Sequence, residues 1–387
     1  MVTVDLVFSD AGGGHRAAAL ALKGVIAAQH RSWNVRLVHL TRVLDTGDAL
    51  RTVAGVSPED LYAGRLTRGW TFGPGAALRL MQSAIRVGHA ELTRRLRDHW
   101  TRTEPDVVVS LVPNFNRVLY ESLREARPGV PFVTVMTDLA DSEPGGWIEP
   151  GQEQYLVCGS ARALEQARAA GYPDARIRES AGTVIRREFY EPATIDRTAG
   201  RAALGLDPRR ATAVVMFGTQ GSAQMLRIAR ALDAVQLILL CGHDGALLDA
   251  LRGMTRSAPH VAVGFTTEVA RYMRLGDLFV GKPGTGSVCE ALQSGLPVLT
   301  FRNAWMLPQE RYTARWIEEN GVGRVVTSVS ALQPAAFDLI ERLDAYRSRI
   351  SLIRNRAVFD VSDLLAELIR VIPGSERPAR RLRALAA

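Results

Sequence analysis

Short apolar runs alternate with longer amphipathic segments along most of the chain. The apolar runs of the first half are Val2–Phe8, Val35–Leu40, Val107–Val112, Phe132–Thr137 and Tyr155–Cys158. Those of the second half are Ala213–Phe217, Gln236–Cys241, His260–Phe265, Asp277–Val280 and Pro297–Phe301. Continuous apolar runs of this length, separated by helical segments, are typical of strands buried in a parallel sheet. The pattern therefore predicts an α/β protein that repeats one architecture in its two halves.

Helical segments lie between and after these runs. The expected helices are Ala17–Gln29, Asn116–Glu125, Ala161–Ala170, Ala223–Leu232, Ser287–Gly295, Gln309–Asn320, Pro334–Arg347 and Val361–Ile372. Residues 186–210 are charged and lack apolar periodicity, and we expect the inter-domain linker there. At 387 residues the chain is long enough for two domains. We expect one domain over residues 1–190, a second over 207–347, and a helix with a basic tail over 348–387 that packs back on the first.

Glycine turns follow three of the apolar runs and precede three of the helices. They span residues 12–16, 218–222 and 281–287. Free N–H groups at a helix N-terminus suit a phosphate or another anion. The second and third turns follow strands of one expected sheet, so together they favour a diphosphate. The third turn lacks the spacing G-x-x-x-x-G-K-[ST] of a Walker phosphate-binding loop.

Particular residues of these turns are candidate ligands. Lys282 is one of the two lysines of the chain and lies in the third turn. The residues that we expect to line the phosphate or a nearby ligand are Gly13, Gly14, Gly218, Thr219, Ser222, Lys282, Gly284, Thr285, Gly286 and Ser287. The structural alternative for the third turn is a capping box, since Ser287 and Glu290 have the spacing S-x-x-E.

His15 and Asp138 are the candidate catalytic residues. His15 stands in the first turn of a helix, where the helix dipole lowers the pKa of an imidazole and favours its neutral form. A neutral imidazole is a competent general base. The alternative is a histidine that only hydrogen-bonds its own loop. Asp138 ends an expected strand, a position where functional groups collect in open α/β sheets.

Composition adds a preference for anionic partners. The formal net charge is +8 and the sequence pI about 9.8, with 47% hydrophobic and 23% charged residues. This charge suits a nucleotide, an anionic membrane surface or nucleic acid, although a general enrichment in arginine would produce it too. No RNA-binding motif occurs, so we expect no nucleic-acid partner. Cys158, Cys241 and Cys289 have no metal-ligand spacing and fit reduced thiols in a cytoplasmic protein.

A basic and apolar stretch covers residues 65–97. It carries Trp70, Phe72, Leu78 and Leu80 among several arginines. Such a stretch can lie on an anionic membrane, or it can be a core-packed helix with a solvated face. The sequence has no run of about 18 apolar residues and shows no signal peptide, so we expect a soluble or peripheral protein.

Several short motifs, in order, resemble the monogalactosyldiacylglycerol synthase group of glycosyltransferase family 28. The resemblance runs from Asp10 to about Val326. In the first half its marks are Gly12–Ala17, Pro105–Ser110, Phe132–Leu139 and Gly182–Arg186. In the second half they are Val263–Phe265, Lys282–Ser287, Glu290-Ala291, Gly295–Pro297 and Gln309-Glu310.

The resemblance implies a GT-B fold, in which two Rossmann-like parallel-sheet domains face each other across a cleft. It implies an inverting transfer of a hexose from a UDP-sugar to a lipid acceptor such as diacylglycerol, without a metal. If the basic and apolar stretch 65–97 lies on a membrane, we expect peripheral contact with the inner face of the plasma membrane. Rival functions are a UDP-sugar epimerase of the same architecture and a nucleotide-sugar-binding protein without catalysis.

The resemblance also implies roles for single residues. His15 would be the base, and Asp138 would orient that base or the acceptor. Phe265 would lie against the uracil, and Glu290 would hold the ribose hydroxyls. Gln309 and Glu310 would hold the sugar, whereas Ser222 and Thr285–Ser287 would hold the diphosphate. The structural alternatives are a core phenylalanine, a capping-box glutamate and a polar pair at a helix start.

Two positions depart from the pattern of this group. Val112 stands where the group often has the histidine of a His-Pro pair, and no histidine follows Trp147. Both positions lie in the half expected to bind the acceptor, so they bear on the acceptor rather than on the donor.

Overall fold

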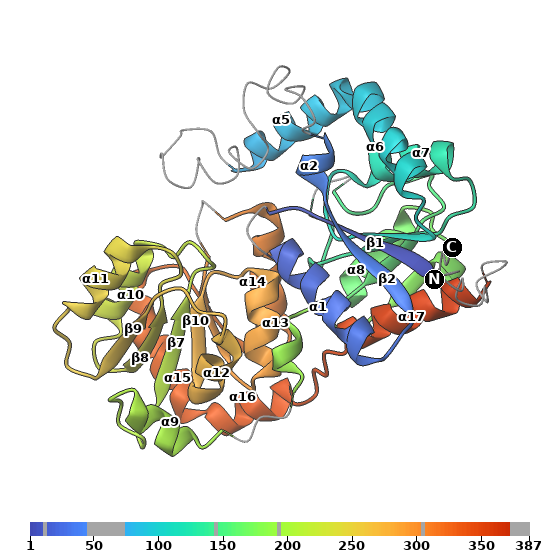
Figure 1. The fold of residues 1–387 in the computed structure, drawn as a ribbon. Coiled ribbons are helices and arrows are strands. Elements are labelled where there is room, and N and C mark those ends of the chain that lie inside the picture. The colour runs from blue at the N-terminus through green and yellow to red at the C-terminus, as the bar shows by residue number, and fades with distance from the viewer. Residues whose placement is uncertain (11–13, 45–73, 143–145, 192–194, 303–305, 372–387) are drawn as a thin grey trace, which may run out of the picture.

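The chain forms two parallel sheets, each with helices around it (Figure 1). The computed structural model describes residues 1–10, 14–44, 74–142, 146–191, 195–302 and 306–371, without the side chains of residues 74–77. Each sheet has six strands, and every pair of neighbouring strands is parallel. The predicted α/β class with two Rossmann-like domains is therefore confirmed.

The first sheet has the strand order β2-β1-β3-β4-β5-β6. Its strands are β1 (Val2–Phe8), β2 (Trp33–His39), β3 (Val107–Ser110), β4 (Phe132–Val135), β5 (Tyr155–Cys158) and β6 (Ile177–Glu179). Its helices are α1 (Gly14–Ala28), α2 (Leu40–Leu44), α5 (Pro74–Val87), α6 (His89–Thr103), α7 (Asn116–Ala126), α8 (Ala161–Ala169) and the short η1 (Asp174–Arg176). Strands β3 and β4 are buried along their whole length, which explains their mostly apolar sequence.

The second sheet has the strand order β12-β11-β10-β7-β8-β9. Its strands are β7 (Thr212–Met216), β8 (Gln236–Leu240), β9 (His260–Val263), β10 (Leu278–Gly281), β11 (Val298–Phe301) and β12 (Gly323–Val326). The helices of this half are α9 (Arg197–Ala203), α10 (Gln224–Ala231), α11 (Gly245–Arg252), α12 (Val269–Leu275), α13 (Thr285–Gln293), α14 (Pro308–Glu319), α15 (Leu332–Glu341) and α16 (Leu343–Ile350), with the short η2 (Arg187–Phe189) and η3 (Val329–Ala331).

The strand order reverses once in each sheet. The first reversal is between β1 and β3; Ser9 directly follows β1, and His15 stands in the first turn of α1. The second reversal is between β10 and β7, which are direct neighbours. The turns 218–222 and 281–287 follow these two strands, as the sequence predicts. Ligands of open α/β sheets bind at such reversals, outside the carboxyl ends of the strands.

The last described helix, α17 (Ala357–Val371), returns to the first domain. Its apolar side chains, such as Val361 and Leu365, share one buried core with α1 and β1, and Figure 1 shows α17 alongside α1. The Asn355 side chain, just before α17, donates to the carbonyl of Thr183 over 2.9 Å. The chain thus crosses between the domains twice, and the two crossings are bonded to each other.

Three sequence expectations need correction. The expected linker 186–210 contains α9, because Arg201 is buried there against Asp277 of the second domain. The expected helix 334–347 is two helices that meet at Arg342. Of the stretch 65–97, for which the sequence left a membrane-surface segment or a core-packed helix open, residues 74–97 fall largely on α5 and α6, whereas residues 65–73 lie outside the described part of the chain. Helix α13 begins at Thr285 rather than Ser287.

Candidate active site

His15 occupies the first turn of α1, directly beyond the carboxyl end of β1. Its Nδ1 lies 3.0 Å from the hydroxyl oxygen of Ser9. Burial lowers the pKa of His15 to about 4, so its imidazole is neutral at pH 7. The position of His15 at a helix start predicted a lowered pKa through the helix dipole. The pKa is lowered, but burial is the cause. When Nδ1 carries the proton and donates to Ser9, Nε2 presents a lone pair and can act as a base.

Asp138 lies three residues beyond β4 and is bonded to both domains. Its Oδ2 accepts a hydrogen bond of 3.0 Å from Nε1 of Trp147. Its Oδ1 accepts one of 3.3 Å from the hydroxyl of Thr285, in the second domain. Burial raises the pKa of Asp138 to about 6, against the lowering effect of these two donors.

Trp147 connects the two candidate catalytic residues. Its ring meets the His15 ring edge to face, with ring centroids 6.2 Å apart. Among the described residues, the hydrogen-bond partner of His15 is Ser9 rather than Asp138. Asp138 is therefore linked to the His15 imidazole through the indole of Trp147, which donates to Asp138 and packs against the imidazole ring.

The N-terminus of α13 presents backbone N–H groups beside this contact. Its N-cap is Gly284, and no side chain caps the helix. The first N–H groups of a helix have no acceptor within it, which makes this end an anion site. A Cβ built on Gly286 would meet no atom within 4 Å, and Ser287 is partly exposed. Thr285, at the same end, is buried and spans Asp138 and Thr313 through its hydroxyl.

Glu290 lies on α13 and is 6% exposed. Its Oε1 accepts from Nε of Arg186 and its Oε2 from Nη2, each over 2.7 Å. The capping-box alternative is wrong for this residue, because the helix begins two residues earlier and the carboxylate pairs with Arg186 instead.

The turn after β7 is locked to the turn after β8. Gly221 has φ +69°, and a Cβ there would lie 2.4 Å from the carbonyl oxygen of Cys241. Gly242 has φ +62°, and its Cβ would lie 2.1 Å from the carbonyl oxygen of Thr219. The backbones therefore approach as closely as glycine permits. Gly218 is also left-handed, at φ +81°, and Thr219 is exposed. The Ser222 hydroxyl accepts from the N–H of Gln224 over 3.2 Å.

Phe265 follows β9 and is 55% exposed, so the alternative of a core phenylalanine is wrong. His243, in the turn after β8, stacks on its ring with centroids 4.0 Å apart and planes inclined by 15°. Both rings lie at the carboxyl edge of the sheet, next to the locked turns. An exposed aromatic face at this edge suits a nucleobase.

Lys282 and Glu310 form an ion pair of 3.3 Å between Nζ and Oε1. The Oε2 atom of Glu310 also accepts from the N–H of Leu307, so this carboxylate closes the start of α14. The alternative of a polar pair at a helix start thus describes Glu310 correctly. Gln309 precedes it on α14 and is partly exposed.

Gly13 lies outside the described residues, and Gly14 begins α1 with open space around its Cβ position. In the described part of the chain, no three His, Cys, Asp or Glu side chains are grouped so that they could hold a metal ion. Within the same residues, no helix is both long and apolar enough to cross a membrane.

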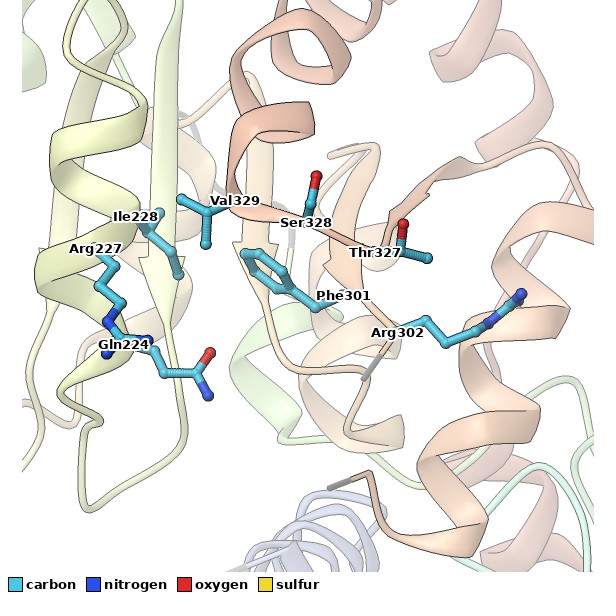
Figure 2. Close-up of a pocket in the computed structure, with 8 residues that line it drawn as sticks. All are labelled: Gln224, Arg227, Ile228, Phe301, Arg302, Thr327, Ser328 and Val329. Atoms are coloured by element: carbon cyan, nitrogen blue, oxygen red, sulfur yellow. The ribbon is translucent and has the colours of Figure 1, made fainter. Parts of the chain in front are cut away.

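A cavity of about 230 Å³ lies beside the locked turns (Figure 2). Residues from α10, the end of β11 and the segment 327–329 line it, among them Gln224, Phe301 and Arg302. None of the predicted donor ligands lines this cavity, but Gln224 connects it to Ser222. The cavity therefore adjoins the expected diphosphate site without containing it.

Sequence reasoning missed four residues of this region: Ser9, Trp147, Arg186 and His243. Arg186 ends the motif Gly182–Arg186 and Trp147 stands at a departure from the group's pattern, but the sequence predicts no role for either. Their contacts join segments that are distant in the chain, such as Arg186 and Glu290, which are 104 residues apart. The position of Ser9 at the end of an apolar run was the one local signal.

Comparisons of sequence identify relatives of one kind, although no family model matches the chain. A probable monogalactosyldiacylglycerol synthase 2 of Oryza sativa subsp. japonica is 29% identical over 235 residues, which are 57% of this chain and 49% of the rice protein. The chain thus spans about half the length of that relative. A probable monogalactosyldiacylglycerol synthase of Glycine max is 26% identical over 407 residues, which are 95% of this chain and 71% of the soybean protein. Monogalactosyldiacylglycerol synthase 1 of Arabidopsis thaliana is 24% identical with the same two coverages.

Solved structures share the fold at low sequence identity. MurG of Acinetobacter baumannii has a TM-score of 0.58 and 13% identity, over 95% of this chain and all of that one. The glycosyltransferase SnogD of Streptomyces nogalater has a TM-score of 0.58 and 15% identity with the same coverage. A putative UDP-N-acetylglucosamine 2-epimerase of Listeria monocytogenes has a TM-score of 0.56 and 15% identity, over 95% of each chain. The predicted resemblance is confirmed: the chain is a GT-B-fold protein similar in sequence to the monogalactosyldiacylglycerol synthases.

Proposed function

We propose that the protein transfers a hexosyl group from a UDP-sugar to the hydroxyl of a lipid such as diacylglycerol, with inversion at the anomeric carbon. The observation that carries the proposal is the position of His15. A neutral imidazole stands at the strand reversal of the first domain, and Asp138 of that domain is bonded to the free end of α13 in the second. The names of the sequence relatives support a glycolipid product.

The reaction makes one bond and breaks one. The acceptor hydroxyl oxygen attacks the anomeric carbon, and Nε2 of His15 takes the hydroxyl proton. The bond between the anomeric carbon and the β-phosphate oxygen breaks, and its electron pair leaves with UDP. Attack from the side opposite to the leaving group inverts the anomeric carbon.

The second domain would bind the donor. The N–H groups at the start of α13 and the turn 218–222 would hold the diphosphate, where the helix dipole stabilises the charge that develops on UDP. Phe265 would stack on the uracil, and Glu290 would accept from the ribose hydroxyls. Gln309 and Glu310 would contact the sugar. Because the N–H groups and the helix dipole at the start of α13 supply positive potential at the diphosphate, we assign no metal to the reaction.

A panel of UDP-sugars tests this function, with and without vesicles that contain diacylglycerol. We expect release of UDP and formation of a glycolipid that both require the lipid, with equal rates in EDTA. An epimerase would release UDP and a modified sugar without any acceptor. Binding of UDP without turnover on any pair would indicate a nucleotide-sugar-binding protein, and a requirement for added Mg²⁺ would contradict the metal-free reaction.

We also propose that α5 brings the protein to an anionic membrane. On this helix Leu80 is 62% exposed and Val87 is 80% exposed, next to the exposed Arg79 and Arg86. An exposed apolar surface flanked by cations suits the interface of a bilayer with anionic lipids. Helix α6 contributes less to this surface, because Arg94 and other arginines on it pair with carboxylates of the same helix.

A further inference from the structure

Trp147 forms hydrogen bonds to the first domain through its backbone N–H, its carbonyl and its indole Nε1. Its N–H donates to Oδ1 of Asp141 over 3.1 Å, and its carbonyl accepts from Nδ2 of Asn116 over 3.2 Å. Its indole Nε1 donates to Asp138 over 3.0 Å. Trp147 is 2% exposed. A side chain held in this way keeps one position and one ring orientation.

Asp141 uses both of its carboxylate oxygens on this loop. Oδ1 accepts from the N–H of Trp147, and Oδ2 accepts from the N–H of Ile148 over 2.9 Å. Both bonds join a carboxylate to backbone N–H groups that are consecutive in the chain. Such charge-assisted hydrogen bonds are stronger than those between neutral groups.

The backbone of Asp141 is itself held by α8. Gln166, on this helix, accepts from the N–H of Asp141 over 2.9 Å and donates to its carbonyl over 2.6 Å. The position of the carboxylate is therefore set by a regular helix rather than by the loop that it binds. Rigid support of this kind is what an active-site side chain needs in order to keep its geometry.

We infer that Asp141 is a positioning residue of the proposed transfer reaction, because it clamps Trp147 against His15 and Asp138. The inference rests on the proposed function. Asp141 touches neither candidate catalytic residue through a hydrogen bond, and Trp147 transmits its effect. Loss of the clamp would free the indole to turn away from the imidazole and would remove the donor at Oδ2 of Asp138.

The test uses Asp141→Asn and Asp141→Ala in the full-length protein, with Asp233→Asn as the matched control. Asp233 also holds a loop through both carboxylate oxygens, which accept from the N–H and the hydroxyl of Ser257. It lies before β8, at the sheet edge opposite the site. The asparagine at 141 keeps the size of the side chain, and thermal melting of each variant checks its folding.

Two readouts separate positioning from general stability. In protein that carries 5-fluorotryptophan, the ¹⁹F line of Trp147 is assigned by its loss in Trp147→Phe, among the six tryptophans of the chain. We expect both Asp141 variants to shift or broaden that line and leave the others unchanged.

With the UDP-sugar and lipid vesicles that give turnover in the wild type, we expect kcat to fall about 10- to 100-fold, since a misplaced catalytic geometry costs this much. The dissociation constant of UDP should stay within about twofold, because UDP binds the other domain.

Two results would overturn the inference. The first is an unchanged Trp147 line in both Asp141 variants, which would show that the clamp does not hold the indole. The second is a displaced line with unchanged kcat and KM, which would make the clamp structural alone. A wild-type protein without turnover on any pair contradicts the proposed function itself, and the positioning role fails with it. Normal wild-type turnover with an unaffected Asp141→Asn variant overturns the positioning role alone.

Discussion

Glu290 and Arg186 form a two-bond ion pair that joins α13 to the segment where the chain first leaves the first domain. The pair fixes the carboxylate in one orientation and leaves its other lone pairs for further donors, since each carboxylate oxygen can accept two hydrogen bonds. A ribose hydroxyl is such a donor. Glu290 can therefore serve the nucleotide while Arg186 holds it in place.

Replacement of Glu290 tests this role in nucleotide binding. We expect Glu290→Ala to weaken UDP binding by roughly 10- to 100-fold, because hydrogen bonds to a charged group contribute about 1.5–3 kcal/mol. Inorganic diphosphate should bind as to the wild type, because it has no ribose. Calorimetry measures both, and Glu268→Ala, which removes an exposed carboxylate of the same domain, is the control. Equal weakening of UDP and diphosphate would exclude Glu290 from the ribose site.

Phe265 should discriminate ligands by their base. Stacking of a base on an aromatic ring contributes about 1–3 kcal/mol, so we expect Phe265→Ala to weaken UDP by roughly 5- to 150-fold. Binding of inorganic diphosphate should not change. Phe265→Trp should retain UDP binding, since it keeps an aromatic face. If Phe265→Ala binds UDP as tightly as the wild type does, the stacked pair with His243 is not the base site.

Asp138 gives a pH dependence of stability with a defined sign. Burial raises its pKa from 3.8 to about 6, so between these pH values the folded protein binds a proton that the unfolded chain releases. The stabilisation is complete below pH 3.8 and is lost as the pH rises through 6. Over that range we expect the free energy of unfolding of the wild type to fall, relative to that of Asp138→Asn, by at most about 3 kcal/mol.

Urea unfolding at pH 4.5, 5.5, 6.5 and 7.5 measures this difference. The comparison must be between the two proteins, because His15 acts in the opposite sense: burial lowers its pKa to about 4, so its contribution is lost as the pH falls. A difference in stability that stays constant with pH would show that the Asp138 carboxyl has an ordinary pKa.

Helix α5 should govern binding to vesicles. We expect the wild type to sediment with vesicles that contain anionic lipid and to be released by salt, because a charged surface is screened within about 10 Å at 0.1 M. Leu80→Glu and Val87→Glu should each reduce the bound fraction, whereas Leu352→Glu, at an 81% exposed leucine elsewhere, should not. Equal binding to neutral and anionic vesicles, or binding to neither, would contradict this account of α5.

The sequence revealed the strands and the glycine turns because both are local signals. An apolar run such as Phe132–Val135 is buried on both faces, and a turn such as 218–222 needs left-handed glycines wherever it occurs. The start of α13 was misplaced by two residues because Ser287 and Glu290 imitate a capping box. Their spacing carries no information about Arg186, which pairs with Glu290 from outside the helix.

The partners of the candidate site could not be predicted, because they meet through tertiary structure. Asp138 and Thr285 are 147 residues apart, and no local pattern indicates that their side chains touch. The sequence does not indicate that the Ser9 hydroxyl lies beside Nδ1 of His15, because this contact depends on how β1 and α1 pack. The exposure of Phe265 agrees with the role that the resemblance implies, although the local pattern alone, an apolar run that ends in phenylalanine, is typical of a buried strand.

Turnover of His15→Ala is the most direct test of the account, measured with saturating UDP-sugar and lipid acceptor from pH 4 to 9. If His15 is the base, kcat should fall by roughly 10²–10⁴-fold, the usual contribution of a general base. The wild-type rate should decline as the pH falls toward the pKa of about 4, where the imidazole becomes protonated, and the variant should lack that limb. Its dissociation constant for UDP should equal that of the wild type. Near-normal turnover of His15→Ala, with the acidic limb retained, would contradict the account and leave His15 a structural residue at the start of α1.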